Sequence, residues 1–392
     1  MKLAAISVLC LLSAIITAQT SIPQLLDSIE KNNYTLKSLR AQADATIVGN
    51  NIGLNPANPQ VEYIYQWGDT EQIGNKQEFH VRQSFDFPTA YRYRKQMTNS
   101  LNEKAERDYL NAYNVVMLDA QFYILKLIYQ NAMLEEYAVR LEHAKQMAEA
   151  FHIKFDEGDA NMLERNKADI NLLNAQNALA RLESEQALLL QQLQGINGGQ
   201  ILRFSMEGWP DAIMPLDFEQ WFKENSDIIP EIQSRQKELS ASRYNEKLSK
   251  AMSLPKLTGG YSSESGTVDK FRGVNVGLSI PLWENKNTVK QAKLNSIAKE
   301  NELADAQLQL YHGLKALYGR ASNMQAVATQ YRNSLMALSN TDLLLVALEN
   351  GQITILEYMM ELSIYYEAIE NALNAELEFQ LNLAQMKAFQ IN

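Results

Sequence analysis

The sequence predicts a mainly helical protein with a transmembrane β part. Two short segments alternate apolar and polar residues as β-strands do, Phe79 to Pro88 and Phe271 to Trp283. Each ends at a corner that contains proline, and each is followed by a helical tract of about sixty residues. Two strand pairs that each lead into a very long helix are typical of a membrane pore that carries a helical tunnel.

Composition and charge narrow the class of protein. The 392 residues include only 17 Gly and 9 Pro, and helix-forming residues dominate most of the chain. The formal net charge of -10 is spread along the chain and argues against a nucleic-acid surface, which needs concentrated positive charge. Beyond the N-terminus no apolar run is long enough for a spanning helix, so we expect any entry into a membrane to be made by strands.

The N-terminus is typical of a secretory signal peptide. Residues 1–18 contain one lysine, an apolar run and a small residue, Ala18, at the expected cleavage site. A buried core helix is the alternative interpretation of this run. Its Cys10 is the only cysteine, so we expect the mature chain to contain no disulfide and no cysteine-ligated metal, and we expect no lipid anchor.

The first half of the mature chain begins with a helical pattern and continues into a strand hairpin at about 58–88. Tyr63, Tyr65 and Trp67 share one face of the first strand, and Trp283 ends a later strand. These aromatic residues are candidates for the bilayer interface, where an apolar ring can stay in lipid while its polar atom stays in water. A half-buried aromatic edge strand is the alternative.

A very long helix is expected from about Ala90 to Phe155, about 100 Å at 1.5 Å per residue. It reverses at FDEGDANMLE, where Gly158 can end one helix and Asp159 or Asn161 can cap the next. A return helix reaches about Leu193, and an irregular linker occupies about 196–215.

The second half repeats this plan. A helix interrupted near Pro230 leads to a strand hairpin at about 255–283, a second long helical tract from Asn285 to about Glu349, and a reversal at LENGQITILE. Gly351 stands where Gly158 stood, and Glu357 where Glu164 stood. The constant offset predicts one duplicated domain over 19–392, with repeats at about 22–195 and 216–390 and helix-end turns at about 156–162 and 349–355.

Unpaired strand edges then limit the assembly. In lipid each unsatisfied backbone group costs several kcal/mol, and four strands are too few to close a barrel of useful bore. Several copies in a closed cyclic arrangement satisfy the edges, and three copies give twelve strands and twelve helical columns.

These residues resemble the TolC outer-membrane efflux family. The resemblance covers essentially the whole mature chain and rests on the two-fold repeat, NPQVEYIY in the first hairpin, both glycine-containing reversals and ENGQITILEYMMELSIYYEAIENALNAELEF. The NP hairpin, the short linker and YRYRK at Tyr91 to Lys95 look most like the branch that serves cobalt–zinc–cadmium type cation pumps.

The resemblance implies a homotrimer in the outer membrane of a Gram-negative bacterium, with a 12-stranded β-barrel that continues into a periplasmic α-helical barrel. It implies a passive exit duct for heavy-metal cations that works with a periplasmic adaptor protein and an inner-membrane pump of the RND type. Docking of the adaptor is expected at Gly158, Asp159, Gly351 and Gln352.

The family closes its tunnel with acidic residues six and nine positions after the second turn glycine, tied by an arginine. Here these positions hold Glu357 and Met360, and Ile353 stands at the arginine position. The resemblance therefore predicts a constriction at Glu357, with Met360 and the counterpart Glu164 as further candidates, and it does not predict an arginine latch.

No catalytic motif, cofactor motif or metal site is expected, so the chain is not predicted to be an enzyme. His152 and Asp156 could form a metal pair, but we expect a solvated helix face there. Met359 and Met360 could be soft metal ligands, but we expect ordinary packing of their side chains. Three functions stay open: metal efflux, the outer component of drug efflux or type I protein secretion, and a soluble periplasmic coiled-coil scaffold.

Overall fold

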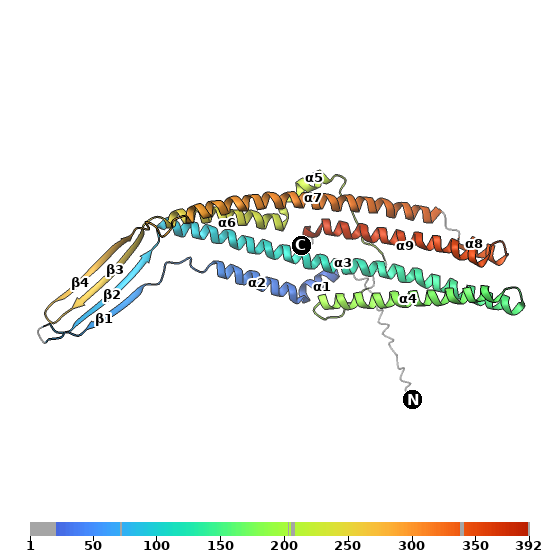
Figure 1. Ribbon diagram of the computed structural model, residues 1–392, viewed down its shortest axis with the longest axis horizontal. Coiled ribbons are helices and arrows are strands. Elements are labelled where there is room, and N and C mark those ends of the chain that lie inside the picture. The colour runs from blue at the N-terminus through green and yellow to red at the C-terminus, as the bar shows by residue number, and fades with distance from the viewer. Residues whose placement is uncertain (1–20, 71–72, 203, 205–207, 338–340, 391–392) are drawn as a thin grey trace, which may run out of the picture. The chain divides into compact units, whose positions relative to one another are not determined.

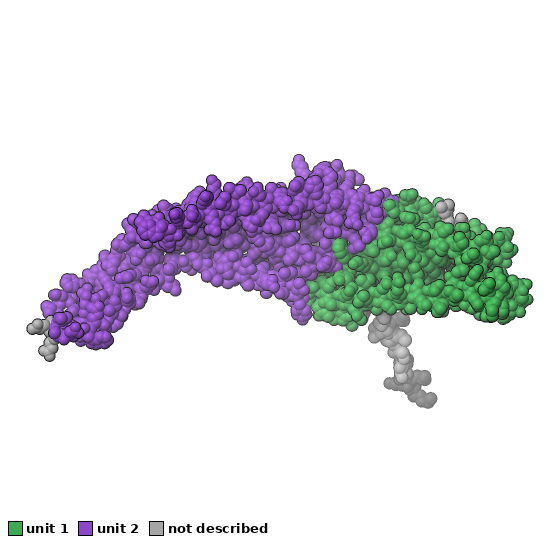
Figure 2. Space-filling model, viewed as in Figure 1, with its two compact units in different colours: residues 1–33, 120–212, 327–377 green, residues 34–119, 213–326, 378–392 purple. Residues whose placement is uncertain are grey.

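The computed structural model describes residues 21–70, 73–202, 204, 208–337 and 341–390 (Figure 1). The expected signal peptide at 1–18 and Cys10 lie outside the described residues. The chain divides into two compact units (Figure 2). Unit 1 is drawn from residues 1–33, 120–212 and 327–377, and unit 2 from 34–119, 213–326 and 378–392.

Helices form most of the described chain, which confirms the mainly helical prediction. They are α1 (Ile22–Asn32), α2 (Tyr34–Asn50), α3 (Pro88–Glu157), α4 (Met162–Ile196), α5 (Phe218–Asn225), α6 (Pro230–Met252), α7 (Thr288–Ala337), α8 (Thr341–Glu349) and α9 (Ile355–Met386), with 3-10 turns at Ser226–Ile228 and Ala388–Gln390. Residues 338–340 of the second long helical tract lie outside the described residues.

The first helical tract is broken where its pattern looked continuous. Asn33 adopts an extended backbone between α1 and α2, and its side-chain amide donates to the carbonyl oxygen of Ile196 at 2.8 Å. Pro230 begins α6 at a position where its missing N–H costs no helical hydrogen bond. The break at Asn33 depends on a residue far along the chain, so local periodicity could not show it.

The four strands of the described residues form one antiparallel sheet. These strands are β1 (Gln60–Gln66), β2 (Lys76–Phe85), β3 (Lys256–Ser265) and β4 (Lys270–Ser279), in the order β1-β2-β3-β4. The two hairpins pair with each other through β2 and β3, with Val81 opposite Tyr261. Among the described residues the sheet has two free edges, one on β1 and one on β4.

The two faces of the sheet differ sharply. Residues directly opposite each other on neighbouring strands point to the same face, so the register assigns every side chain. One face is mostly apolar and contains Val61, Tyr63, Phe79, Val81, Tyr261, Val274, Val276 and Leu278. Its polar side chains include Gln77, Lys270 and Arg272, which lie towards the hairpin end of the sheet. Val274 and Val276 are 82% and 84% exposed, so no described part of the chain covers this face on β4.

The opposite face carries charge. Lys76 Nζ lies 2.6 Å from Glu264 Oε1 and 2.9 Å from Glu78 Oε1, and His80 Nε2 lies 3.0 Å from Glu78 Oε2. A sheet with one uncovered apolar face and one charged face is opposite in character to a soluble sheet, whose apolar face packs on a core.

In unit 2, the ends of the strands are fastened to the helices that follow them. Tyr91 accepts a hydrogen bond from the Asp86 backbone N–H, and Arg94 pairs with the Asp86 carboxylate at 2.7 Å. On the other hairpin, the Asn285 amide donates to the carbonyl oxygen of Met252 at 2.7 Å. YRYRK therefore forms a structural corner, since one of its two arginines is bound to a carboxylate of the same corner.

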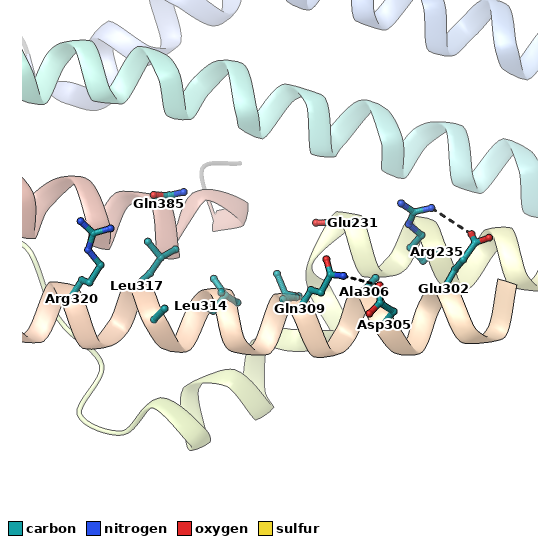
Figure 3. A pocket seen from close by; sticks show the side chains of 13 residues that line it. Glu231, Arg235, Glu302, Asp305, Ala306, Gln309, Leu314, Leu317, Arg320 and Gln385 are labelled. Atoms are coloured by element: carbon teal, nitrogen blue, oxygen red, sulfur yellow. Dashed lines mark hydrogen bonds and ion pairs between the residues drawn. The ribbon is translucent and has the colours of Figure 1, made fainter. Parts of the chain in front are cut away.

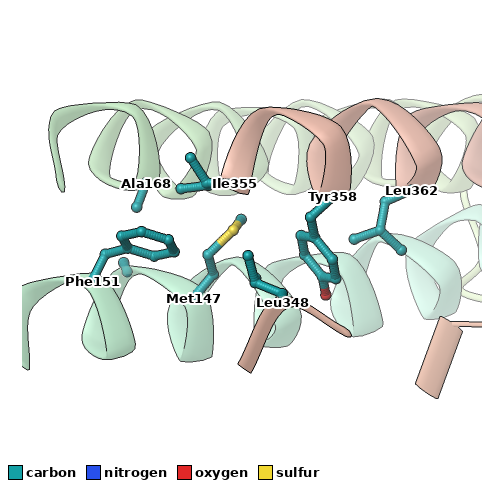
Figure 4. Close-up of a cluster of buried hydrophobic side chains, with 8 residues drawn as sticks. Met147, Phe151, Ala168, Leu348, Ile355, Tyr358 and Leu362 are labelled. Atoms are coloured by element: carbon teal, nitrogen blue, oxygen red, sulfur yellow. The ribbon is translucent and has the colours of Figure 1, made fainter. Parts of the chain in front are cut away.

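In unit 1, the ends of four helices share one hydrophobic core (Figure 4). Met147 and Phe151 from α3, Ala168 from α4, Leu348 from α8, and Ile355, Tyr358 and Leu362 from α9 are all buried. The core lies next to both helix-end turns, so the turns 158–161 and 351–354 lie at the same end of unit 1.

Candidate functional site

The two helix-end turns have the same backbone geometry. Gly158 and Gly351 have φ of 84° and 67°, the left-handed region that an L-residue enters only with strain. In each turn the N–H after the glycine bonds back five residues, from Asp159 to Lys154 O at 2.7 Å and from Gln352 to Ala347 O at 2.9 Å. Both helices thus end in a Schellman motif.

The helices that leave these turns begin in the same way. Asn161 caps α4: its Oδ1 accepts from the Glu164 backbone N–H at 3.0 Å, and its own N–H donates to Glu164 Oε2 at 2.8 Å. Thr354 caps α9 similarly, with 3.2 Å from the Glu357 N–H to Thr354 Oγ1 and 2.8 Å from the Thr354 N–H to Glu357 Oε2. Each cap follows its glycine by three residues and each glutamate by six, so the turns are two copies of one device.

The structure gives Glu357 a role at the helix start in addition to its predicted one at a constriction. Hydrogen bonds from the Thr354 backbone N–H, and then from its hydroxyl, lower the pKa of Glu357 below its ordinary value. Met360 is 58% exposed one turn further along, and Ile353 packs against the hydrophobic core. Glu357 and Glu164 therefore occupy equivalent positions, and the carboxylate of each accepts a hydrogen bond from the backbone N–H of its capping residue.

A largely buried cation that sequence reasoning missed lies deeper in unit 1. Arg140 on α3 is held between the rings of Tyr137 and Tyr366, with its guanidinium carbon 4.3 Å from each ring centroid. It pairs with Glu136 at 3.1 Å and with Glu370, and it donates to the Tyr366 carbonyl oxygen at 3.1 Å. The i,i+4 pair with Glu136 was visible in the sequence, whereas the contacts with α9 span more than two hundred residues.

Burial dominates the acid–base behaviour of this cluster. It raises the pKa of Tyr366 well above the ordinary range of tyrosine. Burial, followed by the hydrogen bond to Glu370, also raises the pKa of Tyr137. Both phenols therefore stay neutral, and the cluster fastens α9 to α3 rather than offering a proton-transfer group.

The aromatic residues predicted for the bilayer interface lie on the sheet or next to its ends. Tyr63 and Tyr65 lie on β1, on the apolar face, and Tyr65 makes an edge contact with Trp67 at 5.3 Å. Trp67 follows β1 at the hairpin end of the sheet, whereas Trp283 follows β4 at the end where the strands join the helices. Both tryptophans are largely exposed.

Candidate metal ligands are dispersed. His152 does not pair with Asp156 on its own helix, because its Nε2 lies 2.8 Å from Asp169 of α4. Within the described ranges, no group of three or more His, Cys, Asp or Glu side chains is arranged to hold a metal ion. None of the helices in the described ranges has an apolar stretch that is long enough to cross a membrane.

A groove in unit 2 measures about 770 Å³ (Figure 3). Its floor is apolar, with Leu314 and Leu317 of α7. Its rim charges face one another, since Arg235 lies 4.0 Å from Glu302, and Gln309 donates to Asp305 at 2.7 Å. These four side chains therefore bind each other rather than point together at a small ligand.

Among known proteins, only solved structures match this chain, and they match in fold. No family model and no curated sequence matches the chain. The solved outer-membrane channel OprN matches with a TM-score of 0.79 at 16% identity, over 94% of this chain and 89% of that one. CusC, a protein studied for transmembrane channel formation, matches with a TM-score of 0.78 at 14% identity, over 95% and 92%.

The CmeC outer-membrane channel of Campylobacter jejuni matches with a TM-score of 0.68 at 17% identity, over 94% of this chain and 84% of that one. At such low identities the likeness concerns the fold alone. The chain has the fold of these outer-membrane channels over nearly its whole length.

Proposed function

We propose that the protein is the outer-membrane exit duct of a tripartite efflux system. It conducts its substrate passively from an inner-membrane pump and a periplasmic adaptor to the exterior of a Gram-negative cell. The observation that carries this proposal is the uncovered apolar face of the sheet, with Val274 and Val276 more than four-fifths exposed. An apolar face of this kind needs an apolar partner, and the opposite charged face suits a water-filled lumen.

The strand lengths support a lipid partner. β2, β3 and β4 each have ten residues, within the nine to eleven that a tilted strand needs to cross a bilayer. Trp67 and Trp283 flank opposite ends of the sheet, as the two aromatic girdles of an outer-membrane strand do.

The free edges support a closed homotrimer. With four antiparallel strands, β4 of one copy can pair antiparallel with β1 of the next, so a head-to-tail ring leaves no edge unpaired. Three such sheets make the expected 12-stranded barrel, continued by a helical barrel. The similarity to outer-membrane channel structures over 94% of the chain is consistent with this assembly.

The helix-end turns are the proposed docking points for the adaptor, through Gly158, Asp159, Gly351 and Gln352, and the pump is proposed to be of the RND type. Glu357 from three copies is the proposed acidic constriction, with Met360 and Glu164 near it. The proposed cargo is heavy-metal cations, which rests on the resemblance of the NP hairpin and of YRYRK to the cobalt–zinc–cadmium branch.

Two experiments test the membrane location and the cargo separately. Envelope fractionation should leave the protein in the membrane until detergent is added, and release without detergent would indicate a soluble scaffold. Growth of a deletion strain on zinc, cobalt, cadmium and copper, beside bile salts and dyes, tests the cargo. Sensitivity confined to metals is expected, whereas sensitivity confined to bile salts and dyes would assign drug efflux and leave the duct intact.

A further inference from the structure

The charged face of the sheet holds a histidine among charges of both signs. His80 is the fifth of the ten residues of β2, so it lies near the middle of that strand. Its Nε2 lies 3.0 Å from Glu78 Oε2, and because an ionised carboxylate can only accept, Nε2 donates this bond. In the neutral ring the other nitrogen, Nδ1, therefore carries no proton. Nδ1 is buried and has no hydrogen-bond partner among the described residues.

The neighbouring strands determine which groups face this ring. Glu62 of β1 lies directly opposite His80, is exposed, and has no ion pair within the described ranges. On β3 the residue opposite His80 is Ser262, which carries no charge. Along β2 itself the neighbours on the same face are Glu78 and Arg82. A second proton on His80 would therefore meet one carboxylate on its own strand and another on β1.

The other charges of this face do not balance. Apart from His80 and one residue at the far end of β3, the charged strand residues on it are three carboxylates and two cations, namely Glu62, Glu78, Glu264, Lys76 and Arg82. The residue at the far end of β3 is Lys256, which pairs with Glu284 at 3.5 Å and so adds no net charge. While His80 is neutral, each copy thus has one negative charge in excess, and protonation of His80 cancels it.

We propose that His80 is a specificity-determining residue of the pore, because its protonation decides whether the charged face attracts cations. The inference rests on the proposed duct, in which this face lines the water-filled lumen. Fixed charges that line a pore favour ions of the opposite sign. Histidine ordinarily changes its charge between about pH 5 and 8, whereas carboxylates ordinarily do so near pH 4. The duct therefore favours cations in a neutral medium and loses this preference in acid.

The test is the ratio of K⁺ to Cl⁻ permeability of the full-length protein in planar lipid bilayers. The reversal potential under a KCl gradient gives this ratio near pH 8 and again near pH 5.5, on either side of the ordinary histidine range. The wild type should favour K⁺ at the higher pH, and the ratio should fall at the lower pH. His80→Gln should keep the high ratio at both, because its amide can donate to Glu78 but takes up no proton. An unchanged pH dependence in His80→Gln would overturn the proposal.

Two further variants separate the switch from the net charge. Glu62→Gln removes one negative charge from the same face of each copy, so the ratio should be lower than in the wild type at both pH values and should still depend on pH. His312→Gln is the matched histidine control, because His312 is exposed on α7, outside the sheet. It should behave as the wild type does. Loss of the pH dependence in His312→Gln would assign the switch to the helices and overturn the proposal.

The same recordings separate this inference from the proposed function. Discrete conductance steps whose K⁺ to Cl⁻ ratio does not change with pH in the wild type would overturn the role of His80 and leave the duct standing. Absence of conductance steps from the wild type at both pH values would overturn both. The amount of each variant in detergent-extracted outer membranes shows that it folds and inserts, and His80→Asn repeats the test with a shorter amide if His80→Gln inserts poorly.

Discussion

The backbone N–H of Thr354 donates to the carboxylate of Glu357 at 2.8 Å, and the same bond recurs at 2.8 Å between Asn161 and Glu164. Both helix-end turns thus combine a glycine stop with a reciprocal cap in the same spacing. Glu357, which is expected to form the pore constriction, therefore also caps the start of α9. Experiments can separate its effect on the constriction from its effect on the helix start.

Replacing Thr354 with alanine removes the cap from α9 and should destabilise the helix start by about 1 kcal/mol. Hydrogen exchange should show faster opening of the amides at 355–358. Asn161→Ala is the matched variant in the other turn and should act equally on the start of α4. A change confined to one turn would contradict the equivalence of the two caps.

The charge of Glu357 should show a defined pH dependence. Because its pKa is lowered in the folded protein, the carboxylate stabilises the fold above its ordinary pKa, and this stabilisation is lost as the pH falls through the lowered value. Glu357→Gln keeps a capping oxygen without the charge. The difference in melting temperature between wild type and variant should therefore be largest near pH 7 and shrink towards pH 3; a constant difference would contradict this origin.

The same variant tests the proposed constriction. If Glu357 from three copies narrows the pore, Glu357→Gln should change single-channel conductance and reduce cation selectivity in lipid bilayers, because three negative charges leave the aperture. Unchanged conductance and selectivity would exclude Glu357 from the constriction.

Exchange of glycine for alanine should act with opposite sign at a turn and inside a helix. Gly158→Ala meets no atom within 4 Å, so its cost is that of the left-handed backbone alone, about 1 kcal/mol. Gly319→Ala lies inside α7, also meets no atom within 4 Å, and should stabilise by about 0.5–1 kcal/mol. Chemical denaturation measures both, and destabilisation by both would contradict the assignment of Gly158.

Removing Arg140 should be costly. Its side chain is 10% exposed and binds two carboxylates and two aromatic rings. Arg140→Ala should destabilise by about 2 kcal/mol, less than the loss of a fully buried pair costs, because Glu370 is partly exposed. The control Arg181→Ala removes an arginine that is 80% exposed and should change stability by less than about 0.5 kcal/mol.

Regular periodicity predicted much of this fold, because strands and long helices repeat their side-chain pattern locally. The helix-end turns at Gly158 and Gly351 could also be predicted, because a helix often ends at a glycine with positive φ. Two features were not readable. The break between α1 and α2 at Asn33 involves a hydrogen bond to the Ile196 carbonyl oxygen. The position of Arg140 involves its contacts with Glu370 and Tyr366. Both are set by partners more than a hundred residues away, which local patterns do not encode.

The two faces of β4 offer adjacent variants that test the membrane assignment. Val276→Arg places a cation on the apolar face and should cost about 2–4 kcal/mol if that face meets lipid near the middle of the bilayer. Asn275→Arg, one residue earlier and on the opposite face, should be tolerated. The amount of each variant in detergent-extracted outer membranes gives the comparison, and equal loss of both would indicate that neither face is specific for lipid.

Conductance of the purified full-length protein in planar lipid bilayers tests the central claim most directly. An outer-membrane duct should insert in discrete conductance steps, each from one trimer, and Val276→Arg should insert far less often than Asn275→Arg. Protein that leaves the envelope without detergent and produces no conductance steps would contradict the account.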